Sequence, residues 1–160
     1  MSTREHFIQA FKDEVPRFVR VLKAIPPAQA GYKPHERSMS AADIASLLAH
    51  ELGDAIAILS KGEVTFVPPG PMSVADAVAL YEKNAAGVKR RLPRVKDAAW
   101  KKKAKFLVDG KVAWEAPLGD MLWGFLFDAI HHRGQLSTYL RPMGAKVPSI
   151  YGPSADDPGM

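Results

Sequence analysis

Four stretches of this chain place apolar residues on one face of a helix, and this periodicity limits the fold more than any other feature. The spacing is i, i+3, i+4 and i+7, which is typical of amphipathic helices. The four stretches span residues 3–25, 41–60, 74–92 and 118–141. Helices of this kind bury their apolar faces most simply against one another. We therefore expect an all-α fold, an antiparallel four-helix bundle.

The chain has the length of one domain, and its 160 residues contain no internal repeat or low-complexity tract. We expect residues 1–160 to form a single domain, with a helical core of about 3–144. Residues 145–160 are rich in Pro, Gly, Ser and Asp, which favour loops. This C-terminal tail is expected to lie over the surface or to be disordered.

One segment between the last two helical stretches has the periodicity of strands instead. Residues 104–115 contain two apolar triplets separated by Asp109 and Gly110, with Lys111 starting the second half. Asp-Gly between two apolar runs is typical of a two-residue type I′ turn. We therefore expect a small β-hairpin directly before the last core helix.

The composition removes several classes of chemistry. The chain has no cysteine, so disulfides, thiolate nucleophiles and metal sites built on sulfur ligands are excluded. The first residues lack the apolar core of a secretory signal, and no apolar run is long enough to span a membrane. We expect a cytoplasmic protein that does not enter a membrane.

The formal net charge of +5 raises the question of nucleic-acid binding. Nine of the basic residues lie within 89–105, a stretch that could contact phosphates. The alternative is a solvated helix end and loop, where Lys and Arg also favour the helix C-terminal dipole. No nucleic-acid motif accompanies the charge, so we favour the solvated interpretation.

The last helical stretch carries the most informative residues. Asp128 and His132 lie four residues apart at the centre of an otherwise apolar stripe. Burying a carboxylate and an imidazole there is costly unless something satisfies them. A metal ion would do so, and this spacing suits two ligands on one helix. The pair could also form an ion pair, or Arg133 could fold back onto the carboxylate.

The same helix contains the run His131-His132-Arg133-Gly134-Gln135. This run closely resembles the signature of the final core helix in the DinB/YfiT-like superfamily of metal-dependent four-helix bundles. The Ser38-Met39-Ser40 helix entry and the Asp109-Gly110 turn are similar to that family as well. The likeness covers about residues 7–144. Gly134 is expected to permit a close approach of another helix.

The resemblance implies a metal site with three ligands, one from the second helix and two from the last. Carried over to this chain, they are His50, Asp128 and His132. Many members have histidine in place of Asp128, whereas relatives resembling the mycothiol-dependent isomerases have a carboxylate. The implied cofactor is one divalent transition metal ion: Zn, Ni, Mn or Fe. His131, Gln135 and Glu51 are candidates to support the ligands.

The function implied by the resemblance is that of a metal-dependent hydrolase, or of a transferase that uses a low-molecular-weight thiol. Its partner would be a small-molecule substrate or the thiol, and no catalytic residue is assigned beyond the ligands. A non-catalytic stress protein that binds a metal or small ligand is a second hypothesis. A nucleic-acid-associated protein using residues 89–105 is a third.

The start of the last helix is apolar on a second face as well. Its residues there are Leu122, Trp123, Leu126, Phe127 and Ile130. Neighbouring helices could cover this face, or part of it could remain exposed as an interface. Because DinB-like bundles commonly pair through helix faces, we expect a homodimer with the metal site inside each subunit.

Overall fold

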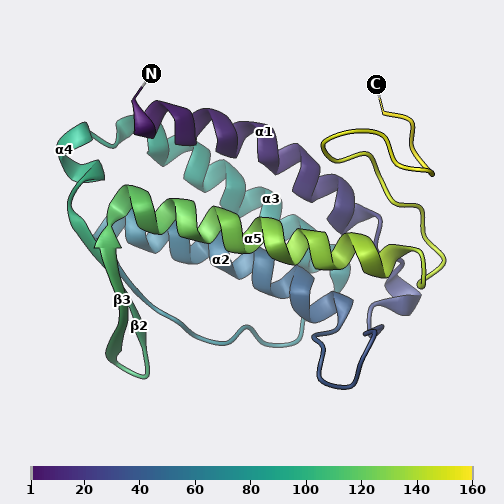
Figure 1. The fold of residues 1–160 in the computed structure, drawn as a ribbon. Coiled ribbons are helices and arrows are strands. Elements are labelled where there is room, and N and C mark those ends of the chain that lie inside the picture. The colour runs from purple at the N-terminus through teal and green to yellow at the C-terminus, as the bar shows by residue number, and fades with distance from the viewer. Residues whose placement is uncertain (1, 160) are drawn as a thin grey trace.

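The computed structural model of the chain describes residues 2–159 and confirms the four-helix bundle (Figure 1). The long helices are α1 (Thr3–Lys23), α2 (Ala41–Lys61), α3 (Val74–Arg91) and α5 (Leu118–Leu140). The short elements are η1 (Pro27–Gln29), η2 (Leu92–Arg94), α4 (Asp97–Trp100) and three strands, β1 (Glu63–Thr65), β2 (Lys103–Val108) and β3 (Lys111–Pro117). No helix in the described part of the chain could cross a membrane.

Local signals in the sequence explain where α1 and α2 begin and where α2 ends. Ser2 and Ser40 each accept a hydrogen bond from the backbone three residues on, and the acidic side chain there accepts one from the serine backbone. These capping boxes satisfy donors that have no partner within the helix. Gly62 ends α2 with φ +76°, a left-handed conformation that glycine adopts without steric cost.

The directions of the helices place the centre of α2 opposite the centre of α5. In the bundle, α2 packs between α3 and α5, and α1 also contacts these two helices. Helix α2 is antiparallel to α5 and parallel to α3, because the segment after β1 runs back along the bundle before α3 begins (Figure 1). The bundle therefore contains two parallel pairs of neighbours, α2 with α3 and α1 with α5, beside its antiparallel pairs.

The expected β-hairpin is present and belongs to a sheet of three strands. Asp109 and Gly110 have φ of +50° and +74°, as a type I′ turn requires. Strand β2 pairs antiparallel with β3 and parallel with β1. The sequence did not indicate β1, because three residues are too few to show a period of two.

The C-terminal tail has no regular structure but is attached to the bundle. Tyr151 donates a hydrogen bond to Glu14 of α1 at 3.0 Å, and Arg141 pairs with Asp156 at 3.0 Å. Hydrogen bonds within residues 147–157 connect parts of the tail with one another. The backbone carbonyl oxygen of Ile150 also accepts a hydrogen bond from Arg17 of α1 at 3.1 Å.

Candidate metal centre and its cavity

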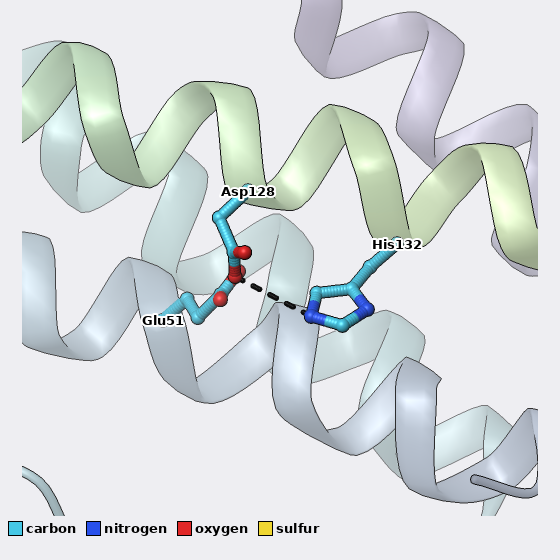
Figure 2. Close-up of side chains that lie close together, drawn as sticks. All are labelled: Glu51, Asp128 and His132. Atoms are coloured by element: carbon cyan, nitrogen blue, oxygen red, sulfur yellow. Dashed lines mark ion pairs between the residues drawn. The ribbon is translucent and has the colours of Figure 1, made fainter. Parts of the chain in front are cut away.

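Three acidic or imidazole side chains meet between α2 and α5 (Figure 2). Glu51 comes from the middle of α2, and Asp128 and His132 come from successive turns of α5. Each residue offers one potential ligand atom, and these three atoms lie within 4.8 Å of one another. The antiparallel packing of α2 on α5 brings the group together, since these residues are far apart in sequence.

His132 is oriented by contacts at both ring nitrogens. Its Nε2 lies 3.3 Å from Oδ2 of Asp128, and its Nδ1 lies 2.8 Å from Oε1 of Gln135. An amide oxygen only accepts hydrogen bonds, so Nδ1 carries the proton and donates. This tautomer leaves the lone pair of Nε2 directed at the acidic side chains. Gln135 thus contacts a candidate ligand.

Glu51 is the less exposed carboxyl of the group and is half-buried. Burial, together with the neighbouring Asp128 as hydrogen-bond partner and like charge, raises its pKa to about 9. Its Oε2 is buried and has no hydrogen-bond partner among residues 2–159. A buried carboxyl with a free oxygen is costly unless a ligand satisfies it.

Asp128 differs in burial from what the sequence suggested. Its side chain is 56% exposed, whereas that of His132 is 16% exposed. The sequence indicated a buried carboxylate at this position because the stripe around it is apolar. In the structure Asp128 lines a cavity, and the more buried carboxyl of the site is that of Glu51, which is half-buried.

His50 does not join this group. Its Nδ1 lies 2.8 Å from the backbone carbonyl oxygen of Ser46, one turn earlier on α2. Successive residues on a helix are separated by about 100°, so neighbouring positions face different directions. Glu51 therefore faces α5 where His50 does not. Glu51 had been assigned only a supporting role, although its place on the apolar face of α2 was visible in the sequence.

The ring of His131 lies on the outer side of the site. It is exposed, and its centroid is 5.4 Å from that of His132 in an edge-on arrangement. His131 therefore contacts the candidate ligand without being one of the three clustered side chains.

A cavity of about 560 Å³ lies against Glu51 and Asp128. Its walls come from α2, the segment after β1, the hairpin and α5. The lining residues are Leu47, Glu51, Asp54, Phe66, Phe106, Trp114, Gly124, Phe125 and Asp128. The volume is in the range of small-molecule sites.

Aromatic rings from the sheet form much of the cavity wall. The centroids of Phe66 and Phe106 are 6.0 Å apart, and Phe125 lies 5.8 Å from Phe106 and 6.2 Å from Trp114. Trp114 sits on Gly124 of α5, where a Cβ atom would come within 2.5 Å of its Cη2. The absence of a side chain at Gly124 therefore leaves the space that the ring of Trp114 occupies. The hairpin thus closes one side of the site.

The close approach expected at Gly134 is absent, since no atom lies within 4 Å of where its Cβ would be. Close packing on glycine occurs instead at Gly124, against Trp114, and at Gly119, against Trp100.

The donor set fits a divalent transition metal ion. Two carboxylates and one imidazole are ligands that Zn²⁺, Mn²⁺ and Fe²⁺ accept. A cation would occupy the free oxygen of Glu51 and offset the repulsion between Glu51 and Asp128. The partly exposed Asp128 leaves this group accessible from the cavity.

The comparisons with known proteins agree with the observed fold. The sequence model of the DinB family matches residues 1–159. None of the curated proteins is similar enough in sequence to match. Three solved structures illustrate the similarity of fold.

A DinB-like protein from Bacillus cereus ATCC 10987 has a TM-score of 0.74 and 18% identity, covering 92% of this chain and 97% of that one. YfiT from Bacillus subtilis, described as a probable metal-dependent hydrolase with an unusual four-helix bundle topology, has a TM-score of 0.70 and 13% identity. The match covers 88% of this chain and 87% of YfiT. A mutant form of the mycothiol-dependent maleylpyruvate isomerase has a TM-score of 0.60 and 14% identity, over 92% of this chain and 63% of that one.

Proposed function

This chain belongs to the DinB family, and from that premise we propose that it is a metal-dependent hydrolase acting on a small molecule. The observation that carries the proposal is the group Glu51, Asp128 and His132 at the wall of the 560 Å³ cavity. The description of YfiT as a probable metal-dependent hydrolase supports the same class of reaction.

In this proposal the three side chains hold one divalent cation at the cavity wall. Glu51 is half-buried near the middle of α2, and the side chain of Gln135 orients the ring of His132. The bound cation would supply Lewis acidity and lower the pKa of a water molecule or thiol. The aromatic wall would hold the substrate and limit the access of bulk water.

The charge of the cavity favours hydrolysis over thiol transfer. Its lining contains three carboxyl groups and no Lys or Arg. A thiol cosubstrate that carries carboxylates would meet repulsion there and no counter-charge. Transfer to such a thiol, suggested by the mycothiol-dependent isomerase among the structural neighbours, is therefore the second candidate.

The two non-enzymatic hypotheses receive less support. A binding protein without activity would be favoured by a closed metal site, whereas Asp128 here is open to the cavity. The basic residues of 89–105 are distributed over α3, η2, the segments on either side of α4, and β2, and Lys103 is paired with Glu115 at 2.7 Å. They do not form a single helix face for nucleic acid.

Metal analysis of the purified protein tests the centre. We expect about one equivalent of a divalent transition metal by mass spectrometry in protein purified without chelator. Glu51→Gln and His132→Ala should each remove most of it. His50→Ala decides between the two ligand sets: full metal content supports Glu51, and loss of metal supports the set expected from sequence. Full metal in all of these variants and in Asp128→Asn would contradict a centre between α2 and α5.

Activity is tested separately on the metal-loaded protein. Uncharged aryl esters and amides are expected to be hydrolysed, and Asp128→Asn to lower the rate at least tenfold, the scale of a lost metal ligand or its support. Turnover that requires an added low-molecular-weight thiol would favour transfer. No turnover of either kind by a fully metal-loaded protein would favour the binding protein.

We also retain the homodimer and the cytoplasmic location as parts of the proposal. On the second face of α5, Leu122 and Leu126 are buried within the subunit and Phe127 is 61% exposed. An exposed Phe beside the partly exposed Trp123 supports pairing through this face. Light scattering during size exclusion should give twice 17.5 kDa, and Phe127→Ser should shift the mass to that of the monomer. A monomeric wild-type protein would rule the dimer out.

A further inference from the structure

A third carboxyl group lines the cavity but does not belong to the metal centre. Asp54 lies one turn after Glu51 on α2 and is half-buried. It makes no side-chain hydrogen bond and no ion pair within residues 2–159. Burial raises its pKa to about 6, against the opposing effect of His50. At neutral pH Asp54 therefore remains mostly ionised.

The rest of the cavity wall is aromatic. Phe106 and Trp114 come from the hairpin, Phe66 directly follows β1, and Phe125 comes from α5. The faces of such rings attract cations, most strongly when water is excluded. The same rings give an apolar body a surface against which to pack.

The charge of the cavity stays negative when the metal centre is filled. A divalent cation would balance Glu51 and Asp128, because each contributes one negative charge. Asp54 would then be the remaining charge in the lining, which contains no Lys or Arg. A neutral ligand would leave this half-buried carboxylate without a partner, and an anionic ligand would be repelled by it.

We propose that the cavity selects small molecules in which an organic cation, an amino or quaternary ammonium group, is joined to an apolar body. Asp54 binds the cationic group, and the aromatic wall packs against the body. Asp54 is thus a specificity residue for the reaction proposed above. The catalytic part of this inference rests on the proposed function, whereas the binding preference does not.

Binding of three probes of similar shape tests the preference on the full chain loaded with zinc. The probes are benzylamine, benzyl alcohol and benzoate, measured by isothermal titration calorimetry. We expect benzylamine to bind on the order of tenfold more tightly than benzyl alcohol, the scale of one partly buried charge pair. Benzoate should bind most weakly. Equal binding of the amine and the alcohol, tighter binding of benzoate, or no binding of any probe would overturn the proposal.

Asp54→Asn assigns the preference to one side chain. The variant should lose the tenfold advantage of benzylamine and keep its affinity for benzyl alcohol. Asp120→Asn, an exposed carboxylate on α5 outside the cavity lining, is the matched control and should bind like the wild type. An unchanged preference in Asp54→Asn would overturn the assignment. The wild-type order of the three probes remains a test should that variant fold poorly.

Metal content separates this inference from the proposed function. Asp54→Asn should keep its full equivalent of metal, because Asp54 lies outside the clustered ligands. Selective amine binding by a chain that holds no metal would contradict the metal-dependent hydrolase and support the cavity preference. Full metal content and hydrolysis without amine selectivity would support the metal-dependent hydrolase and contradict the cavity preference.

Discussion

Helix α5 contributes to two groups of charged side chains that differ in their balance of charge. Arg133, only 2% exposed, donates to Glu14 of α1 and, at 2.6 Å, to the hydroxyl of Tyr151. Arg17 also donates to Glu14, at 2.8 Å. The guanidinium of Arg133 lies 4.5 Å from the ring centroid of Phe18. Opposite charges thus face each other, and the tail is bound to the bundle through Tyr151.

One residue earlier on the same helix, His132 faces a different neighbourhood. There Glu51 and Asp128 are like charges, and one oxygen of Glu51 has no partner among residues 2–159. In the first group opposite charges pair within the chain, although the buried Nε of Arg133 has no hydrogen-bond partner among residues 2–159. In the second group two carboxyl groups of like charge lie together, and a cation would balance them. The two groups thus differ in their balance of charge.

The largest effect is expected from breaking the balanced group. Arg133→Ala should lower the free energy of unfolding by about 3–5 kcal/mol, because it removes a buried ion pair and leaves the buried Glu14 with Arg17 alone as its counter-charge. Urea unfolding followed by circular dichroism measures it. Arg141→Ala removes a pair with Asp156 that is largely exposed and should cost less than about 1 kcal/mol. Equal losses in the two variants would contradict the contrast.

The unbalanced group should instead make the metal-free protein sensitive to pH. The pKa of Glu51 rises from 4.5 to about 9 on folding, so the folded state binds the proton more tightly. Stability should therefore fall as pH rises between these values. Glu51→Gln has no such proton and should be more stable than the wild type by a few kcal/mol at pH 8.5.

Urea unfolding in EDTA at pH 6 and pH 8.5 measures this difference. The two proteins should differ less in stability at pH 6 than at pH 8.5, and they should converge only below pH 4.5, where Glu51 is protonated in the folded and the unfolded state. If the free energy of unfolding changed equally with pH in the wild type and in Glu51→Gln, the pKa of Glu51 would not be raised on folding. Adding zinc should reverse the slope for the wild type, because a bound cation favours the ionised carboxylate.

A smaller effect is expected at the cavity wall. In Gly124→Ala the new Cβ would lie 2.5 Å from Trp114, so the ring must move. Overpacking of this kind costs about 1–3 kcal/mol. Tryptophan fluorescence should shift and benzylamine affinity should fall, while metal content stays unchanged. Unaltered fluorescence and binding would mean that the position of the Trp114 ring does not depend on its contact with Gly124.

The smallest effect is expected at Gly134, which serves as the control for Gly124. Its Cβ would meet no atom within 4 Å, and the position is exposed within α5. Gly134→Ala should raise the unfolding free energy by about 0.5–1 kcal/mol through helix propensity. Thermal unfolding measures the gain. A loss of stability would reveal a packing role for this glycine of the signature.

The sequence alone determined the helices, their caps and the hairpin, because these depend on neighbouring residues. Ser40, Gly62 and the Asp109-Gly110 turn act within a few residues of themselves, so their effects can be read from local spacing. The pairing of Asp128 with His132 is local as well, since four residues make one turn. The signature around Arg133 identified the family for the same reason.

Only the tertiary structure decided which residue of α2 meets this pair. Glu51 and His50 are adjacent, and the rotation of α2 against α5 brings Glu51 into the group. That rotation depends on packing along the whole length of both helices, which no local pattern specifies. The cavity also depends on tertiary packing. Its lining residues Phe66, Trp114 and Asp54 are separated in sequence, and only the packing of the sheet and helices brings them to the wall of one cavity.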